Sequence, residues 1–248
     1  MDRLIYTSLS GLRGAMARQA VTANNLANAN TVGFRAELAD ARALYVDGAG
    51  LKARASASEE VLSADMTAGA LTATGRDLDI ALNGDALLAV QSREGDEAYS
   101  RRGDLQLSDS GLLTTGDGMP VLGAQGPITL PPADRVQIGP TGAISILPLN
   151  SPPGTEMQVV DQLKLVSPAG ASVKKGLDGL FRETNGGTLA ADPDARLTSG
   201  SLEGSNVSTT KALTDMIDAS RSWETQIKMI STAQELDQSS ADIMRLPD

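Results

Sequence analysis

The strongest constraint on the fold is a helical stripe of apolar residues at each end of the chain. Along the N-terminal stripe, the apolar members are Ile5, Leu9, Leu12, Met16, Ala23 and Leu26. Steps that alternate between four and three residues place side chains on one seam of a helix, as in a coiled coil. Gln19 and Asn30 occupy the remaining seam positions. The stripe therefore predicts a helix that ends near Val32.

Gly33 and Phe34 follow this stripe and indicate how the helix ends. Glycine readily adopts the left-handed conformation that closes many helices, and the next residue often packs back onto the last turn. We therefore expect the helix to stop at Gly33 and the chain to turn outward after Phe34.

A second stripe occupies the C-terminal end of the chain, after Gly204. Its seam positions are Leu213, Met216, Ser220, Trp223, Ile227, Ile230, Gln234, Asp237, Ala241 and Met244. Ser205, Asn206 and Ser208 are all suitable N-caps for this helix. Residues 1–35 carry a side-chain charge of +3 and residues 208–248 a charge of −3. Opposite charge favours association, so we expect the two terminal helices to pair in a coiled-coil-like arrangement.

The middle of the chain has a different pattern of apolar and turn-forming residues. Between 77 and 166, short apolar runs such as DLDIAL and ALLAV alternate with Gly, Pro, Asp and Asn. Short strands with frequent turn signals predict an all-β module. The expected fold class is α+β, with a discontinuous helical domain formed by 1–35 and 205–248, an extended connector over 36–76, and a β-rich domain over 77–204.

The composition argues against catalysis. The chain contains neither histidine nor cysteine, which removes Ser–His–Asp and Cys–His chemistry and the usual zinc and iron–sulfur ligands. Ser208 and Lys211 match an S-x-x-K pattern, but we interpret Ser208 as a helix cap. Arg101 and Arg102 could form a small basic patch, but we interpret them as exposed arginines at a strand end. We expect no enzyme, cofactor or metal site.

The net charge and the N-terminal sequence bear on partners and location. A net charge of −10 argues against a nucleic-acid partner. The first twenty residues lack the continuous apolar region of a cleaved signal peptide, since Arg13 and Arg18 interrupt it. No run approaches the roughly twenty apolar residues that a membrane span requires. We therefore expect no direct insertion into a membrane.

Four asparagines crowd the end of the first helix, although asparagine is a mediocre helix former. At about 100° per residue, Asn25 and Asn28 lie within about 100° of Asn24, on the face away from the seam. Asn30 falls within the seam, where a polar residue typically sets register. We expect the three outward amides to contact a second partner, with solvent exposure as the alternative. The predicted subunit interface comprises Asn24, Asn25, Asn28, Asn30, Gly33 and Phe34.

The segment NNLANANTVGF resembles the N-terminal signature of the bacterial flagellar axial proteins, the rod, hook and hook-junction subunits. Further segments similar to that family are DLDIALNGDALLAV, YSRRGDLQLSDSGLLTTGDGMPVLG, DGLFRET and GSLEGSNV. Within the family, the MDRLIYT start, the short connector and the length most resemble a proximal-rod subunit. A distal-rod or hook-family subunit is the alternative.

The resemblance implies a structural subunit that stacks helically, its terminal helices lining an inner tube that is part of a drive shaft and export channel. The implied partners are copies of the chain, other proximal and distal rod proteins, and the flagellar type III export apparatus. The implied location is the basal-body rod in the periplasmic space, reached without signal cleavage. A secreted β-module enzyme or adhesin is the alternative from another class.

Overall fold

The computed structural model describes residues 2–45, 55–152, 154–176 and 178–244, and within these the side chains of 2–7, 39–45, 55–63 and 243–244 are not described. The chain divides into two compact units. The helical unit comprises Met1–Ala27, Glu37–Ser63 and Ser208–Asp248, and the β unit comprises Asn28–Ala36 and Ala64–Val207. Each unit thus combines segments that are far apart in the sequence.

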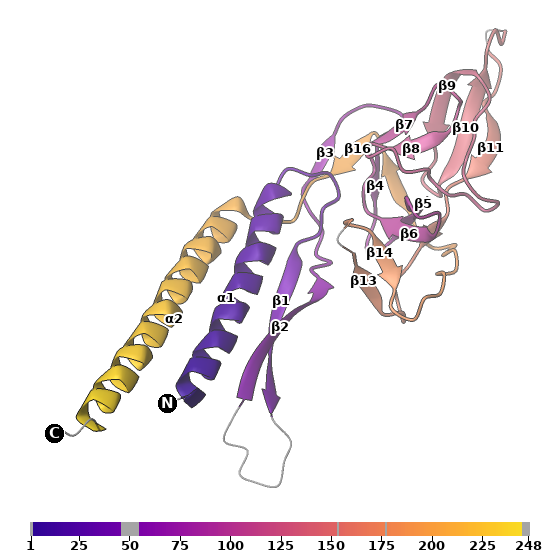
Figure 1. Ribbon diagram of the computed structural model, residues 1–248. Helices are drawn as coiled ribbons and strands as arrows, with labels where there is room; N and C mark the ends of the chain where they lie inside the picture. The colour runs from indigo at the N-terminus through magenta and orange to yellow at the C-terminus, as the bar shows by residue number, and fades with distance from the viewer. Residues whose placement is uncertain (1, 46–54, 153, 177, 245–248) are drawn as a thin grey trace. The chain divides into compact units, whose positions relative to one another are not determined.

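The helical unit contains α1 (Asp2–Ala27), α2 (Thr209–Met244) and a two-stranded sheet of β1 (Glu37–Tyr45) and β2 (Ala55–Ala64). The two helices contact each other and run in opposite directions, so the start of α1 and the end of α2 lie at the same end of the pair (Figure 1). β1 contacts α1. The expected N- and C-terminal helices and the central β-rich region are therefore present.

The buried stripe of α2 keeps the heptad period but not the expected residues. Ala212, Ala219 and Ala233 are buried, each separated from the next by seven or fourteen positions. The predicted seam residue Leu213 follows Ala212 directly and is 51% exposed. Ile227 follows Gln226, which lies seven residues after Ala219, and is 46% exposed. Alanine has the smallest side chain that still favours a helix. A partner helix can therefore approach an alanine stripe more closely than a leucine stripe.

The α1 side of this contact also consists of small residues. Ala15 and Ser8 are buried, and a Cβ added at Gly11 would lie 3.0 Å from the Gln226 side chain of α2. Met16, one residue beyond Ala15 and in the predicted seam, is 52% exposed. The buried face of α1 thus lies beside the predicted apolar seam and not on it. Small side chains occupy this face because they allow the two helices to pack closely.

The described residues of the β unit form fourteen strands. They are β3 (Leu71–Ala73), β4 (Ile80–Leu82), β5 (Leu87–Gln91), β6 (Glu97–Ser100), β7 (Leu105–Leu107), β8 (Leu113–Thr115), β9 (Ala133–Ile138), β10 (Ala143–Pro148), β11 (Gln158–Gln162), β12 (Leu165–Val166), β13 (Val173–Lys175), β14 (Phe181–Glu183), β15 (Leu197–Ser199) and β16 (Ser201–Glu203). The sheets have the orders β12-β5-β6-β14-β13, β11-β10-β9, β15-β4, β16-β3 and β7-β8. The strand pairings in these sheets are antiparallel.

The core of the β unit lies on both faces of the five-stranded sheet. Along β5, Leu88 and Val90 belong to one buried apolar cluster, whereas Leu87 and Ala89 belong to another. Successive side chains of a strand point to opposite faces, so β5 separates the two clusters. This explains why its sequence reads as a continuous apolar run rather than as alternating apolar and polar residues.

Two element boundaries differ from the expectation. α1 ends at Ala27, five residues before Val32, and the following turn is closed by a hydrogen bond from Thr31 N to Asn28 O of 3.1 Å. The segment 36–76, expected as an extended connector, contains β1, β2 and β3. The pairing of β3 with β16, a strand more than a hundred residues later, is not visible in a local sequence pattern.

Candidate functional site

Gly33 lies at the centre of a buried cluster in the β unit, which we call the junction and define as Gly33, Arg35, Arg101, Glu203 and Asn206. Gly33 has φ of +67°, and an added Cβ would lie 2.4 Å from the Arg101 carbonyl oxygen. Its N–H donates to the Glu203 carbonyl at 2.7 Å. Glycine is required here by both conformation and space. The positive φ was expected, but it serves this close approach and not the end of α1.

The Glu203 carboxylate lies between two buried arginines. Arg35, Arg101 and Glu203 are 1%, 2% and 2% exposed. One carboxylate oxygen lies 2.8 Å from Arg35 Nη2 in an ion pair and accepts a hydrogen bond of 2.9 Å from Gly69 N. The other accepts from Arg101 Nε at 3.0 Å and from Arg101 Nη2. A single negative charge thus serves two positive charges that are shielded from water.

Arg101 uses every donor of its guanidinium. Besides the two bonds to Glu203, Nη1 donates to the carbonyls of Gly84 at 2.6 Å and Ala86 at 2.8 Å, and Nη2 donates to Leu82 O at 2.8 Å. An arginine has five N–H donors, and all five are occupied here. The expectation that Arg101 is an exposed strand-end arginine is wrong. The chain turn between β4 and β5 supplies a cage of carbonyls that local sequence does not reveal.

Arg35 is less completely satisfied than Arg101. Its Nη1 donates to Thr67 O, but Nε has no hydrogen-bond partner among the described residues. Burial lowers the pKa of the Arg35 guanidinium, and the charge of Arg101 lowers it further, whereas Glu203 opposes both effects. The charge of Arg35 therefore depends on its counter-ion Glu203.

Phe34 and Arg35 are also held by Lys175 of β13. The Lys175 ammonium lies 3.6 Å from the centroid of the Phe34 ring and donates to Arg35 O at 2.9 Å. A cation over an aromatic face is attracted by the ring's quadrupole. Phe34 thus contacts β13 within the β unit.

Asn206 ties the residues before α2 to the segment that follows Arg35. Its Oδ1 accepts from Ala36 N at 2.8 Å, and its Nδ2 donates to Asp65 O at 2.9 Å and Thr67 O at 3.0 Å. These bonds join three chain segments through a single amide. Asn206 was expected only as one of several N-caps, whereas Ser208 performs that role, its Oγ accepting from Lys211 N at 3.4 Å. This contact agrees with the interpretation of Ser208 as a cap.

Asn24 and Asn25 have their partner within the helical unit, at the start of β1. Asn25 Nδ2 donates to Glu37 O at 2.9 Å, and Asn25 Oδ1 accepts from Glu37 N at 2.8 Å. Asn24 Nδ2 lies 3.2 and 3.1 Å from the two carboxylate oxygens of Glu37. The second partner expected for these amides is thus, at least in part, another segment of the same chain.

The other predicted interface and seam residues are in varied environments. Asn28 Oδ1 accepts from Thr31 Oγ at 3.1 Å, and Asn30 is exposed. Half-buried side chains among the predicted seam residues are Leu9, Leu12, Leu26, Met216, Trp223 and Ile230. The side chain of Ile5 lies outside the described residues. The role of these residues in a subunit interface remains a prediction.

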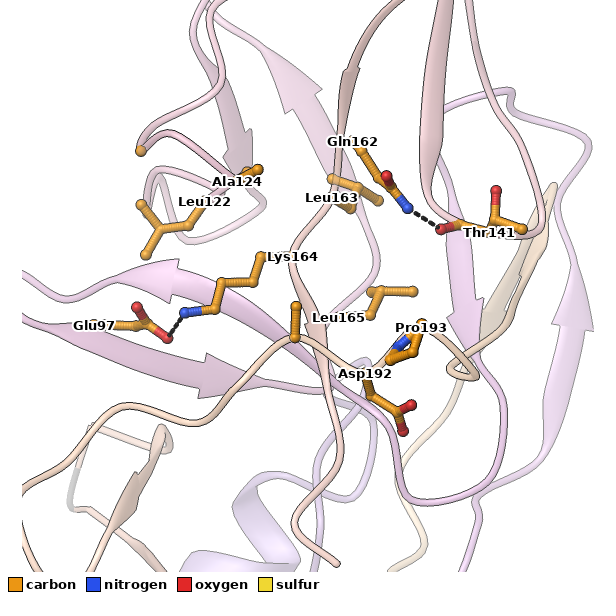
Figure 2. A pocket seen from close by; sticks show the side chains of 13 residues that line it. Glu97, Leu122, Ala124, Thr141, Gln162, Leu163, Lys164, Leu165, Asp192 and Pro193 are labelled. Carbon is orange, nitrogen blue, oxygen red and sulfur yellow. Dashed lines mark hydrogen bonds and ion pairs between the residues drawn. The ribbon is translucent and has the colours of Figure 1, made fainter.

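The β unit also has a cavity of about 480 Å³, shown in Figure 2. Lys164 points toward Glu97, with Nζ 2.6 Å from the carboxylate, and Gln162 Nε2 donates to Thr141 O at 3.1 Å. Leu122, Leu163 and Leu165 supply much of its apolar lining. Lys164 and Glu97 form an ion pair, and the Asp192 carboxylate also lines the cavity.

Two further properties bear on the kind of site. Within the described ranges, no three acidic side chains gather closely enough to hold a metal ion. None of the helices in the described part of the chain combines the length and the apolarity that crossing a membrane requires.

The combination of antiparallel terminal helices with a β unit that contains a buried ionic junction indicates a structural protein. Comparison with known families places it among flagellar axial proteins. The matching families are "Flagella basal body rod protein" over residues 5–35, "Flagellar hook protein FlgE/F/G D1 domain" over 81–146 and "Flagellar basal body rod FlgEFG protein C-terminal" over 198–243. The junction takes residues from all three matched stretches, since Arg35, Arg101 and Glu203 each lie in a different one.

Individual relatives narrow the assignment. The chain is 45% identical over 241 residues to the flagellar basal-body rod protein FlgF of Salmonella typhimurium, covering 95% of each protein. It is 44% identical to FlgF of Escherichia coli, covering 94% of each. It is also 32% identical to the rod protein FlgG of Bacillus subtilis, over 99% of this chain and all of that protein. The chain belongs to the flagellar basal-body rod protein family, whose members are structural subunits and not known enzymes.

Proposed function

We propose that this rod subunit occupies the proximal rod and assembles helically through its terminal helices, with copies of itself and with other rod proteins. In this arrangement the paired helices line the export channel and the β units form the outer wall of the drive shaft. The 45% and 44% identities to FlgF proteins, against 32% to a FlgG protein, favour the proximal position.

The observation that carries this proposal is an apolar stripe on α2 that its own chain leaves exposed. Leu213, Ile217 and Ile227 are 46–55% exposed. At about 100° per residue they fall within an arc of about 80°, and they span about 21 Å along the helix. Because Ala212, Ala219 and Ala233 form the buried stripe, the larger side chains remain available. Exposed apolar patches of this kind mark protein interaction sites.

Charge supports the same use of the helices. The residues of α1 carry three arginines and one aspartate, a net +2, and residues 208–248 carry a net −3, so a helix pair presents surfaces of opposite sign to its neighbours. Exposed ion pairs contribute little individually, below about 1 kcal/mol, but complementary charge sets orientation. We propose that burial of the α2 stripe stabilises the contact and that charge selects its direction.

The proposed route to this position is the flagellar type III export apparatus, without signal cleavage, into the periplasmic space. The intact mass of the protein recovered from basal bodies tests this point. A mass that includes the N-terminal residues of the chain is expected, and a shortened N-terminus contradicts the proposal.

The experiment that tests assembly combines Leu213→Ser, Ile217→Ser and Ile227→Ser in one chain. We expect the variant to retain its far-ultraviolet circular dichroism but to be absent from purified, detergent-extracted basal bodies, with loss of swimming. The matched control carries Leu149→Ser and Val159→Ser, two exposed apolar positions of the β unit. Normal incorporation of the α2 variant would refute the proposed interface. A secreted enzyme or adhesin would not fractionate with basal bodies at all.

A further inference from the structure

The β unit is closed by the segment nearest its C-terminal end. Strand β15 pairs with β4, with Leu197 opposite Leu82, and β16 pairs with β3, with Glu203 opposite Leu71. Asn206 then binds Ala36 from the other end of the unit. More than a hundred residues separate each of these partners. The first part of the β unit therefore lacks its closing strands until residues 197–207 are present.

Among the described residues, Glu203 is the carboxylate that contacts both Arg35 and Arg101, and Asp65 adds a weaker favourable charge near Arg35. The remaining partners of the Arg101 guanidinium are the carbonyls of Leu82, Gly84 and Ala86, which carry partial charges only. Within the described part of the chain, the remaining hydrogen-bond partner of the Arg35 guanidinium is Thr67 O. Burying a cation without a counter-ion is strongly unfavourable, and here two cations would also repel each other. Without Glu203 the native positions of both arginines are unfavourable.

We propose that Glu203 is a completion latch, which prevents the β unit from reaching its native fold until the C-terminal segment is in place. In an incomplete chain the two arginines stay in water and hold the segments of Arg35 and Arg101 apart. Arrival of Glu203 neutralises them, and its backbone carbonyl accepts from Gly33 N in the same step. A chain delivered from its N-terminus thus remains open over its first two hundred or so residues. The latch acts on folding order and does not depend on the assembly proposed above.

The first test uses Glu203→Gln in the full chain, with the exposed Glu156→Gln as the matched control. We expect the latch variant to lose on the order of 10 °C or more in the melting temperature of the β unit, and the control to keep the wild-type value. Equal melting temperatures for both variants would overturn the proposal.

The second variant distinguishes charge from shape and remains informative if Glu203→Gln fails to fold. Arg35→Met in the Glu203→Gln background removes one of the two cations but keeps a long apolar side chain. Thr67 O retains a donor, since Asn206 Nδ2 also bonds to it. We expect the double variant to melt at a higher temperature than Glu203→Gln alone. A melting temperature equal to or below that of the single variant would refute charge neutralisation as the latch.

Pulse-labelling hydrogen exchange during refolding of the full wild-type chain tests the order of events. The amides of Gly33 and Gly69 bond to Glu203, so their protection reports latch closure. We expect the amides of β5 and β6 to gain protection in the same kinetic phase as these two glycines. Protection of β5 and β6 in an earlier, separate phase would show that the first part of the unit folds without the latch.

Discussion

The side-chain amide of Asn25 pairs with both backbone groups of Glu37, donating to the carbonyl at 2.9 Å and accepting from the N–H at 2.8 Å. A residue on a neighbouring antiparallel strand would offer the same pair of bonds. Asn25, a residue of α1, therefore satisfies the hydrogen-bonding groups of the first backbone residue of β1. This is a positive use for a residue that weakens the helix in which it lies.

Replacing Asn25 with alanine should destabilise the helical unit by about 1–3 kcal/mol, because the backbone N–H and C=O of Glu37 lose their hydrogen bonds to the Asn25 amide. Thermal unfolding followed by circular dichroism at 222 nm measures the effect. Asn30→Ala is the matched control, since Asn30 is exposed. Equal stability of the two variants would mean that the pairing contributes nothing.

Replacing Gly33 with alanine should be more destabilising than the same change at Gly75. Both residues have positive φ, +67° and +74°, which costs a side-chain-bearing residue about 1–2 kcal/mol. Only at Gly33 would the new Cβ meet backbone, because nothing lies within 4 Å at Gly75. We expect an additional loss of about 1–3 kcal/mol at Gly33. Denaturant unfolding of the two variants measures this difference directly, and similar losses would contradict the close approach to Arg101.

Replacing Arg101 with lysine should destabilise the β unit by about 3–5 kcal/mol even though the charge is kept. An ammonium has three donors on one atom and cannot reach three carbonyls and a carboxylate at once. The comparison is Arg135→Lys, at an exposed arginine whose Nε bonds to Asp77 at 2.9 Å. Little change is expected in that variant. If both substitutions have the same small effect on the unfolding midpoint, the five bonds of Arg101 are not the basis of its role.

Replacing Ala219 with leucine tests the register of the helix pair. The larger side chain should overpack the buried stripe and cost about 1–3 kcal/mol. Ala241→Leu, at an exposed position of the apolar seam first expected from sequence, should have no such effect. The helical signal at 222 nm as a function of temperature compares the two. Destabilisation by Ala241→Leu alone would favour the original seam.

Asp178 and Arg182 give the β unit a pH-dependent contribution. Hydrogen bonding by the Arg182 guanidinium, at 3.1 and 2.6 Å, is the main reason that the pKa of Asp178 lies below its ordinary value of 3.8. A lowered folded-state pKa stabilises the fold above pH 3.8, and this contribution disappears as the pH falls through the folded-state pKa. The pair is partly exposed, so the effect is small.

Asp178→Asn should therefore lower the melting temperature slightly at pH 7, and the difference from wild type should vanish at pH values below the folded-state pKa. Asp134→Asn, at an exposed carboxylate, is the control. Melting curves measured across this range decide the matter. A difference that stays constant down to the lowest pH would contradict the ion pair.

Much of the secondary structure can be predicted from short stretches of sequence, because helices and turns depend on residues that are close together in the chain. The heptad spacing predicts both helices, and the turn signals predict the β-rich middle. Ser208 is a residue type that favours a helix N-cap, and Gly33 is one that favours a positive φ. The segments that resemble axial proteins also include most of the junction. Arg101 lies in YSRRGD and Glu203 in GSLEGSNV, although nothing in either stretch indicates that these charges are buried together.

The sequence by itself determined the family, the two helices, their heptad period and the β-rich middle. Only the tertiary structure decided that alanines rather than leucines form the buried stripe of α2, that α1 ends at Ala27, and that Arg35, Arg101 and Glu203 meet out of water. The physical reason is range. Helical period and turn chemistry follow from residues a few positions apart, whereas a buried ionic cluster and a helix register depend on partners from distant segments. The role of Glu203 as the counter-ion of two arginines can be seen only in the folded structure.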